Sequence, residues 1–579
     1  MKQLMLGNAA VARGLYEAGC KVVSSYPGTP STEITEEAVK FPEIYCEWAP
    51  NEKVAAEAAF GASLAGVRSA CAMKHVGLNV AADPVFSISY IGVHGGMVIC
   101  VADDPGMHSS QNEQDSRHYA RASKIPMLEP ADSEEALQFT KLAFEISEKF
   151  NTPVFLKLCT RIAHSQSVAE TGERQERPVI PYVKDTHNVM TPANAKVRHP
   201  IVEERTRKLI EYGNTSPVNR VEMGSDGIGI ITSSTSYQYV KEVFGDRASV
   251  LKLGMVWPLP DGLILDFASK VKQLYVVEEL DPFIEEHCKA LGLKVTGKEL
   301  LPLCDEFSQS LLEEKFSRPE KPYRAFPEPI PPRPPVLCSG CPHRGIFYLL
   351  QKLGVTVIGD IGCYTLGSAA PLSAMDINIC MGASVSAEHG FNVALGKESQ
   401  NKTVSVIGDS TFVHSGMTSL ADIAYNQSAS TVLILDNSIT GMTGHQQNPT
   451  TGYNIKGDPA GKIDLEALCK AMGIGRVRVV DPYNLAQCEQ ALKEELAADE
   501  PSVIIVRRPC VLLKQVKTAA PLAVDPAKCV GCKACMKLGC PSISIRDKKA
   551  HIDETLCVGC GVCKELCRMD AFTGKTMMD

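Results

Sequence analysis

Short apolar runs alternate with segments of helical periodicity up to about residue 165. Four of these runs have the composition of buried strands, at residues 20–30, 68–73, 96–104 and 153–159. Strands that alternate with helices are typical of βαβ units and a parallel sheet. The first twenty residues carry Arg13 and Glu17 inside an apolar pattern, which predicts an amphipathic helix and not a signal peptide. The chain is therefore predicted to open with an α/β domain.

The same alternation recurs twice further along the chain. A second, smaller α/β unit is predicted from strand-like runs at 227–234, 248–254 and 273–280, and a third from runs at 355–362, 402–409, 430–437 and 502–508. Eight prolines among residues 319–335 predict a stiff, extended linker between these two units. The predicted plan is a domain at 1–170, a polar linker at 171–225, a domain at 226–318, a Pro-rich linker at 319–336, a domain at 337–518 and a cysteine-rich tail at 519–579.

Composition narrows the environment and the partners. A net charge of -8 leaves no basic footprint, which argues against nucleic acid and anionic membranes. No apolar run approaches the roughly 18 residues that a membrane span requires. The 22 cysteines, without an export segment before them, favour free thiols in a reducing compartment. We therefore expect a soluble, cytoplasmic protein.

The tail contains two runs of four cysteines. They read CVGCKACMKLGCP from residue 529 and CVGCGVCKELC from residue 557, so CVGC recurs 28 residues apart as an internal repeat. Thiolates spaced by two residues wrap one face of an iron–sulfur cluster. Paired C-x-x-C units also suit a tetrahedral zinc, but zinc does not need the three-cysteine run. The spacing predicts two [4Fe-4S] clusters.

The two runs resemble the bacterial-ferredoxin pattern, in which the fourth cysteine of each run binds the other cluster. That pattern assigns one cluster to Cys529, Cys532, Cys535 and Cys567, and the other to Cys540, Cys557, Cys560 and Cys563. The sequence departs from the pattern twice: the first run has four residues before its last cysteine where three is usual, and Arg568 replaces the proline after the last cysteine. The loop of the first cluster is therefore expected to be looser, and its cluster more labile.

Polar side chains end two neighbouring predicted strands of the third unit. Asp409 in VIGDSTF closes one strand, and Asn437 in LILDNSITGMTGHQ closes the next, 28 residues later. The carboxyl ends of neighbouring parallel strands meet at one edge of a sheet, where α/β proteins bind ligands. A carboxylate, an amide oxygen and a turn carbonyl such as that of Ile439 suit magnesium, whose other positions take phosphate oxygens. An aspartate at a strand end is common, so the paired segments, rather than GD alone, predict a diphosphate site.

This spacing resembles the thiamine diphosphate motif, and GMTGHQ resembles the loop that follows it in the 2-oxoacid:ferredoxin oxidoreductase family. The resemblance implies doubly wound pyrimidine and diphosphate domains, a transketolase-C-like domain and a ferredoxin-like tail. It also implies cofactor or magnesium contacts for Gly408, Asp409, Ser410, Asn437, Ile439 and Gly441. Ser410 stands where the motif usually has glycine, and His445 where the family loop often has a second glycine, so the local loop geometry is expected to differ.

The first domain then matches the pyrimidine half of such a site. YPGTPSTE resembles the family's YPxTPSS segment, and NEKVAAEAAFGAS resembles the helix that carries the cofactor-activating glutamate. The resemblance implies that Glu52 shares a proton with the aminopyrimidine ring and so drives its imino tautomer. Glu57 is the competing glutamate on the same helix. Thr29 is either a substrate contact or a turn residue, and His75 and Arg117 are weaker candidates for holding a substrate carboxylate.

Four cysteines outside the tail resemble the family segments WCPGCG, GIGCS and a late PC, which hold the cluster nearest thiamine. They are Cys338, Cys341, Cys363 and Cys510. Electrons need a first acceptor beside the cofactor, and a mobile tail joined near residue 520 is not expected to reach it alone. Two alternatives are open: Cys363 and Cys510 are core-edge thiols without a metal, or Cys338 with Cys341 binds zinc together with two other ligands.

The resemblance covers nearly the whole chain, and the domain order is similar to that of the larger subunit of arylpyruvate-oxidising members. It implies that thiamine diphosphate decarboxylates a 2-oxo acid, that coenzyme A takes the acyl group, and that the clusters pass two electrons singly to ferredoxin. Pyruvate, a branched-chain 2-oxo acid and 2-oxoglutarate are alternative substrates. A smaller γ-type partner subunit is expected, in an α2β2 assembly, because no residues remain for the family's γ-type domain.

Two other classes of function use some of these sequence features. A non-redox thiamine decarboxylase would need Asp409, Asn437 and Glu52, but it has no use for eight cluster cysteines. A pure electron-transfer subunit would use the tail and leave the thiamine segments without a role.

Overall fold

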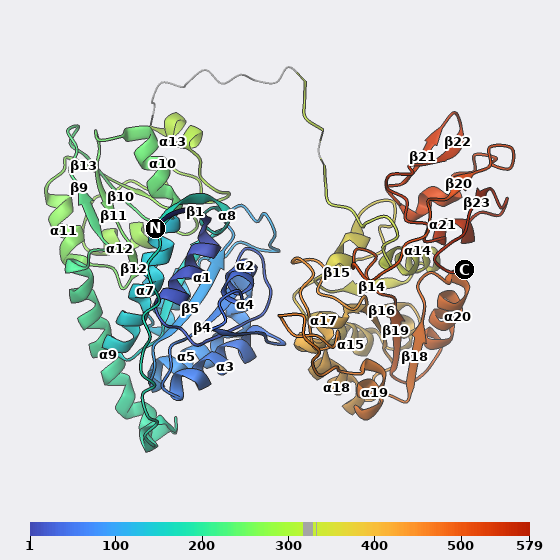
Figure 1. The fold of residues 1–579 in the computed structure, drawn as a ribbon, viewed down its shortest axis with the longest axis horizontal. Coiled ribbons are helices and arrows are strands. Elements are labelled where there is room, and N and C mark those ends of the chain that lie inside the picture. The colour runs from blue at the N-terminus through green and yellow to red at the C-terminus, as the bar shows by residue number, and fades with distance from the viewer. Residues whose placement is uncertain (317–327, 332) are drawn as a thin grey trace. The chain divides into compact units, whose positions relative to one another are not determined.

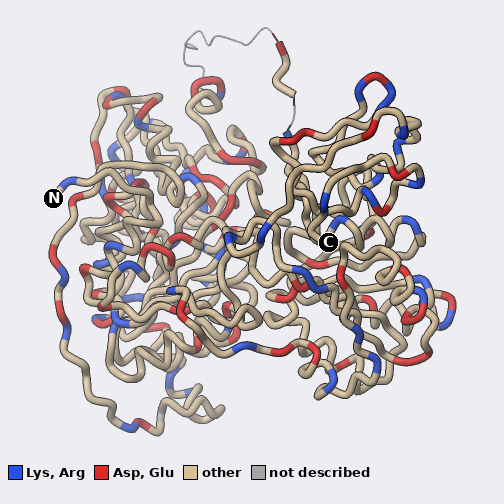
Figure 2. Tube along the Cα trace, turned by 45° about the vertical axis from the view of Figure 1, so that its right-hand side comes forward, with Lys and Arg blue, Asp and Glu red and all other residues tan. Residues whose placement is uncertain are grey.

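The computed structural model describes residues 1–316, 328–331 and 333–579 (Figure 1). The chain divides into two compact units, Met1–Phe326 and Pro327–Asp579, and each is described by itself. Most of the predicted Pro-rich linker at 319–336 lies outside the described residues. Figure 2 shows that acidic and basic residues are interspersed along the chain in each unit.

A seven-stranded sheet forms the centre of the first unit, in the order β12-β6-β7-β5-β4-β2-β3. Its strands are β2 (Val22–Ser25), β3 (Tyr45–Trp48), β4 (Ser69–Lys74), β5 (Met97–Asp103), β6 (Met127–Leu128), β7 (Val154–Cys159) and β12 (Met255–Trp257). All neighbours are parallel except β12 and β6, which pair antiparallel. β4, β5 and β7 are buried along their whole length, as parallel strands with helices on both faces are. The four strands predicted here are confirmed.

Helices follow the strands of this sheet. They are α1 (Gly7–Glu17), α2 (Thr32–Ala38), α3 (Glu52–Leu64), α4 (His75–Val80), α5 (Ala82–Ile91), α6 (Arg117–Ser123), α7 (Ser133–Phe150) and α8 (Thr160–His164). The predicted N-terminal helix begins only at Gly7, because the preceding residues form β1 (Lys2–Leu6), which pairs antiparallel with β8 (Gln166–Glu170). That partner is more than 150 residues away in sequence, so local periodicity does not reveal it.

A second, four-stranded sheet in the same unit has the order β13-β10-β11-β9. Its strands are β9 (Arg220–Glu222), β10 (Ile228–Thr232), β11 (Ser249–Lys252) and β13 (Gln273–Val277), with helices α10 (Ser234–Phe244), α11 (Asp261–Ser269), α12 (Phe283–Ala290) and α13 (Gln309–Lys315). The strands predicted from 227–234, 248–254 and 273–280 are present. This segment also contributes β12 to the first sheet, so the two α/β regions are one packed body.

The predicted polar linker at 171–225 contains β9 and a long helix, α9 (Pro192–Thr215). Arg205 on α9 is 6% exposed and donates hydrogen bonds to the carbonyl oxygens of Ser89 (3.0 Å) and Asn151 (3.1 Å). Few apolar side chains of α9 are buried, Val202 and Leu209 among them, which explains why its pattern resembles a solvated connection.

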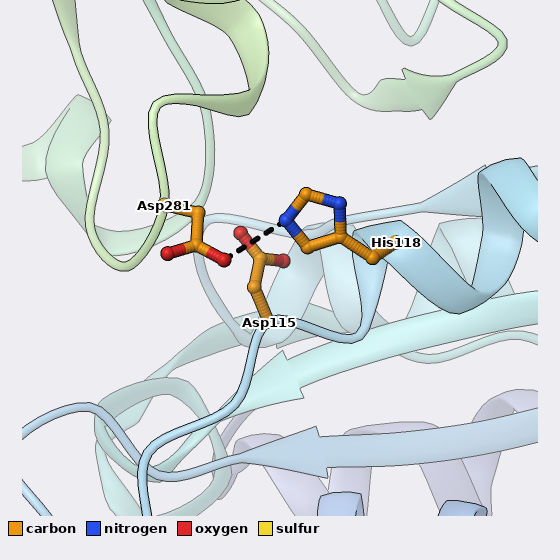
Figure 3. Close-up of side chains that lie close together, drawn as sticks. All are labelled: Asp115, His118 and Asp281. Carbon is orange, nitrogen blue, oxygen red and sulfur yellow. Dashed lines mark hydrogen bonds and ion pairs between the residues drawn. The ribbon is translucent and has the colours of Figure 1, made fainter.

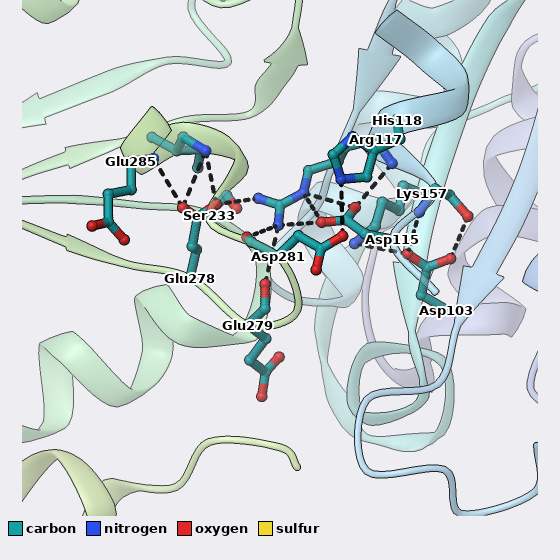
Figure 4. Close-up of polar contacts among 12 residues, drawn as sticks. Asp103, Asp115, Arg117, His118, Lys157, Ser233, Glu278, Glu279, Asp281 and Glu285 are labelled. Atoms are coloured by element: carbon teal, nitrogen blue, oxygen red, sulfur yellow. Dashed lines mark hydrogen bonds and ion pairs between the residues drawn. The ribbon is translucent and has the colours of Figure 1, made fainter. Parts of the chain in front are cut away.

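Buried ion pairs join the two α/β regions of the first unit (Figure 4). Arg117 is 2% exposed, and its Nη2 lies 2.6 Å from Asp115 and its Nη1 2.5 Å from Glu278. Asp115 precedes α6, whereas Glu278 follows β13. Burial alone would raise the pKa of Asp115, but the Arg117 guanidinium reverses this and holds the pKa below its usual value. Arg117 is therefore a structural cation and is not open to a substrate carboxylate.

Asp115 also lies beside His118 and Asp281 (Figure 3), and His118 Nε2 is 2.9 Å from the Asp281 carboxylate. In the described part of the chain this is the one set of three potential single-ion ligands whose atoms all lie within 4.8 Å of one another. Arg117 already neutralises Asp115, so these three residues extend the buried ion-pair network toward the surface and do not require a metal ion.

The second unit contains a six-stranded, wholly parallel sheet in the order β15-β14-β16-β17-β19-β18. Its strands are β14 (Thr356–Gly359), β15 (Ile377–Asn378), β16 (Thr403–Gly408), β17 (Thr431–Asp436), β18 (Arg476–Val480) and β19 (Ser502–Arg507). The principal helices are α14 (His343–Leu353), α15 (Ala383–Leu395), α18 (Met417–Tyr425), α19 (Leu465–Ala471) and α20 (Leu485–Leu496). The four predicted strands of this domain are again present.

The cysteine-rich tail is built from short elements. These are β20 (Ala523–Val524) paired with β23 (Phe572–Thr573), the hairpin β21 (Ile543–Arg546) and β22 (Lys549–Ile552), a 3-10 turn at Ala534–Leu538 and α21 (Val562–Glu565). Leu522, Leu538 and Val562 of the tail share one hydrophobic cluster with Ile346 and Phe347 of α14. The expectation of a mobile tail was wrong: it packs on the preceding domain. None of the helices in the described ranges has the length and apolar composition to cross a membrane.

Replacing Arg117 by methionine should destabilise the first unit strongly. The change leaves Asp115 and Glu278 buried without their shared cation, which typically costs about 3–5 kcal/mol. Thermal unfolding of the full chain measures this loss, and Arg121→Met on the exposed face of the same helix is the control. An Arg117→Met protein as stable as the control, with a raised KM for substrate, would contradict the structural role.

Candidate functional site

Polar residues gather at the carboxyl edge of the second unit's sheet. Asp360 follows β14, Asp409 follows β16, Asn437 follows β17 and Cys510 follows β19 by a few residues. β16 and β17 are adjacent and in register, with Gly408 opposite Leu435. The sheet thus brings these four loops to one place, as expected for parallel strands.

Asp409 is 3% exposed and accepts a hydrogen bond from Thr450 Oγ1 at 3.0 Å. Burial, with the nearby Asp436 adding to it, raises the pKa of Asp409 to about 7. Asp436 is itself paired with Arg507 at 2.7 Å, so among the described residues Asp409 has no cation of its own. A buried carboxylate of this kind fits a divalent cation, which would favour its charged form.

The loop after β17 lies against Asp409's own loop. Thr440 Oγ1 donates to Ser410 Oγ at 3.0 Å, and Ile439 N–H donates to Asn437 Oδ1 at 3.3 Å. Gly408 is required because a Cβ there would lie 2.7 Å from the ring of Tyr364. The structure therefore brings the predicted residues of the two segments together.

Three residues of this edge were not predicted from the sequence. Thr450 and Asn448 complete the hydrogen-bond chain to Asp409, since Thr450 Oγ1 also lies 2.6 Å from Asn448 Oδ1. Asp360 is fully buried and accepts hydrogen bonds from Gly382 N (2.9 Å) and Ser384 N (3.1 Å) at the start of α15. A signal for Asp360 was present, because VIGD occurs at both 357–360 and 406–409.

The pyrimidine-half candidates lie in the first unit. Glu52 is the first residue of α3 and is 4% exposed, and the Asn51 side chain caps the helix by accepting from Val54 N at 2.9 Å. Glu57, by contrast, is exposed and paired with Lys53. Glu52 carboxylate atoms lie against Gly77 of α4, where a Cβ would be 2.5 Å from Oε1. Burial thus separates the two glutamates that the sequence left in competition.

Thr29 is partly buried, and its carbonyl oxygen accepts from Ser109 Oγ at 3.3 Å. Lys74, at the end of β4, was not predicted; it is 8% exposed and donates to Ser109 O at 2.6 Å. Burial lowers the pKa of Lys74 to about 8. His75 is fully buried, and its Nε2 lies 3.2 Å from Asn112 O. It therefore lies beside the loop that follows β5, whereas Arg117 is held in ion pairs with Asp115 and Glu278.

The tail cysteines surround two separate cavities. The first tail set, Cys529, Cys532, Cys535 and Cys567, lines one cavity, and the second tail set, Cys540, Cys557, Cys560 and Cys563, lines the other. Each set contains one cysteine from the other run, which is the crossed arrangement that the pattern implied. Ala550 N–H donates to Cys529 Sγ (3.4 Å) and Ala571 N–H to Cys567 Sγ (3.3 Å). Such N–H···S bonds favour thiolates in the first tail set, and the four cysteines around each cavity fit a cubane cluster.

Cys338, Cys341, Cys363 and Cys510, the loop set, come from three segments that the fold brings near one another. Burial raises the pKa of Cys363 to about 11, and the neighbouring thiols of Cys510 and Cys338 add to the rise. Burial likewise raises the pKa of Cys341 to about 12, with contributions from Cys338 and Cys363. Thiols held together in this way fit a metal, which binds them as thiolates. His445 Nε2 lies 3.9 Å from Cys510 Sγ. Among the described residues, however, no three ligand atoms from the loop set and His445 all lie within 4.8 Å of one another, so this arrangement does not favour the single zinc ion of the alternative.

Comparisons with known proteins agree with this geometry. Residues 13–220 match the family model described as "Pyruvate flavodoxin/ferredoxin oxidoreductase, thiamine diP-bdg", residues 360–506 match "Thiamine pyrophosphate enzyme, C-terminal TPP binding domain", and residues 550–573 match "4Fe-4S binding domain". Indolepyruvate oxidoreductase subunit IorA of Archaeoglobus fulgidus is 41% identical over 98% of this chain and 96% of that protein. The chain belongs to the indolepyruvate oxidoreductase IorA family. The IorA subunit of Pyrococcus horikoshii is similarly related, at 40% identity over 99% of this chain and 96% of its own length.

A more distant relative shares part of the IorA-family chain. The 2-oxoglutarate synthase subunit KorA of Archaeoglobus fulgidus is 24% identical over 52% of this chain and 96% of that protein. Family membership confirms the predicted fold class, the thiamine diphosphate-binding domains and the 4Fe-4S-binding tail. The number of clusters, the magnesium and the individual site residues stay predictions.

Gly77→Ala should reduce activity while the fold persists. The new methyl group would meet the end of the Glu52 side chain, which can swing away without moving the backbone. We expect turnover to fall at least tenfold with an unchanged circular dichroism spectrum. Gly61→Ala on α3 is the matched control, because a Cβ there meets nothing within 4 Å. Equal activity of the two variants would contradict the placement of Glu52 in the catalytic apparatus.

Proposed function

We propose that this chain catalyses the oxidative decarboxylation of arylpyruvates, indolepyruvate among them, to the aryl-acetyl-coenzyme A and carbon dioxide. The two electrons leave through iron–sulfur clusters to ferredoxin. The observation that carries the proposal is near-full-length similarity to proteins named indolepyruvate oxidoreductase subunit IorA, at about 40% identity. The reaction also gives each part of the chain a use: the thiamine segments would serve the decarboxylation, and the cysteine sets would serve the electron transfer.

Thiamine diphosphate supplies the carbanion chemistry when bound, and the residues of this chain position it. Asp409, Asn437 and the Ile439 carbonyl would hold magnesium, with Gly408, Ser410 and Gly441 beside the diphosphate. Glu52 would exchange a proton with the aminopyrimidine nitrogen, and its burial supports this role because a buried carboxyl is shielded from competing water. Thr29 would face the substrate.

Three clusters carry the electrons in this proposal. The loop set would bind the first acceptor, and the second and first tail sets the next two. Cys341 supports this order, because it belongs to the loop set and also lines the cavity of the second tail set. Ferredoxin-type cubanes reach the low end of a potential range of about -700 to +450 mV, which suits a strongly reducing donor.

A smaller β subunit of the γ type would complete the enzyme as α2β2. The word subunit in the names of the relatives supports a partner chain. A chain that alone oxidised arylpyruvates at the full rate of the mixture would contradict this part of the proposal.

The decisive experiment is a panel of 2-oxo acids assayed anaerobically with coenzyme A and a viologen acceptor, using the chain co-expressed with its smaller partner. We expect the highest kcat/KM for indolepyruvate and other arylpyruvates over pyruvate, branched-chain 2-oxo acids and 2-oxoglutarate. Glu52→Gln should retain thiamine diphosphate and lose about 100- to 10,000-fold in turnover. A preference for 2-oxoglutarate would instead favour the activity named for the KorA relative.

Iron analysis tests the number of clusters. Three cubanes require about twelve irons per chain and two require about eight. Cys363→Ala should lower the count to about eight while the tail clusters persist. Wild-type protein that holds about eight irons after strictly anaerobic purification, with zinc present, would favour the zinc alternative for the loop set.

A further inference from the structure

One buried cation lies between two of the cysteine sets. Arg344 is the second residue of α14, and its side chain is 5% exposed. It lines the cavity of the second tail set together with Cys341. Four cysteines lie close enough for their thiolates to interact electrostatically with the guanidinium and favour its charged form: Cys540, Cys341, Cys338 and Cys560. Two of these belong to the loop set and two to the second tail set.

The guanidinium also joins the two chain segments that carry these cysteines. Nε donates to Cys338 O at 2.9 Å, and Nη2 donates to the carbonyl oxygen of Leu337. On the other side Nη1 donates to Leu538 O at 2.9 Å and to Gly539 O at 2.7 Å. The accepting residues adjoin or include Cys338 on one side and adjoin Cys540 on the other, so Arg344 fixes both ligand loops.

These contacts do not neutralise the positive charge of Arg344. Among the described residues no carboxylate forms an ion pair with Arg344, unlike Arg117 in the first unit. Carbonyl oxygens satisfy its N–H groups but do not neutralise its charge, and an unpaired buried charge is costly. A cubane with four thiolate ligands is an anion and becomes more negative when it is reduced. The negative charge that is missing from the protein would therefore come from the clusters.

We propose that Arg344 is the shared counter-charge of the clusters bound by the loop set and by the second tail set, and raises the reduction potential of both. This rests on the cluster assignment in the proposed function. A fixed positive charge stabilises the reduced form of each cluster more than the oxidised form, because the reduced form is more negative. Arg344 thus acts as a positioning residue through the clusters, and it does not touch the substrate.

The test is an EPR-monitored redox titration of the full chain, without substrate, for the wild type, Arg344→Gln and Arg344→Lys. Glutamine keeps a donor for the carbonyl oxygens but removes the charge, whereas lysine keeps the charge. Signals are assigned with Cys363→Ala and Cys529→Ala, each of which removes one set. We expect Arg344→Gln to shift the reduced-to-oxidised ratio of both neighbouring clusters at least tenfold toward the oxidised form, which is a fall of about 59 mV. Arg344→Lys should stay near the wild type.

The first tail set is the internal control, because Arg344 does not line its cavity. Its potential should not move in either variant. Unchanged potentials of the second tail set in Arg344→Gln, or equal shifts in all clusters, would overturn the proposal. If Arg344→Gln loses iron, the lysine variant decides. A tenfold shift of its reduced-to-oxidised ratio toward the oxidised form, which is a fall in potential of about 59 mV, would exclude a charge effect. A chain with only two clusters would refute the third cluster yet leave the prediction for the second tail set in force.

Discussion

The carboxyl ends of parallel strands necessarily meet at one sheet edge, and both units of this chain depend on that constraint. In the second unit it places the loops after β14, β16, β17 and β19 together, so that Asp409, Asn437, Cys363 and Cys510 become neighbours. In the first unit it places Thr29, Lys74 and the loop after β5 together by the same rule. Chemistry in each unit is assembled from residues that are far apart in sequence, because adjacent strands share a direction.

Two buried arginines illustrate different answers to the cost of a buried charge. Arg117 is neutralised by Asp115 and Glu278, and the price is a pair of carboxylates withdrawn from any other use. Arg344 is surrounded by carbonyl oxygens and cysteines. The first arrangement stabilises the packing of two α/β regions in the absence of any ligand, whereas the second is complete only when thiolates carry the negative charge.

Packing of the tail determines how electrons could leave the second unit. The tail and the diphosphate domain share one hydrophobic cluster, so the cavity of the second tail set is bounded by Cys341 and Arg344 as well as by tail residues. The four residues between Cys535 and Cys540 form the end of the 3-10 turn at Ala534–Leu538 and then Gly539, which is in a left-handed conformation, φ 62°. Glycine is required there, because a Cβ would lie 2.6 Å from Pro371.

The sequence by itself determined the α/β class, the positions of the main strands and the residue types of each candidate site. These follow from local signals: apolar runs of strand length, a glycine–aspartate pair after a strand, and cysteines at fixed short spacings. Tertiary structure alone decided which glutamate of α3 is buried, that Arg117 is taken up in ion pairs, that β1 pairs with β8, and that the tail is docked. The reason is physical, because each of these outcomes depends on partners that are distant in sequence, and local periodicity carries no information about burial against them.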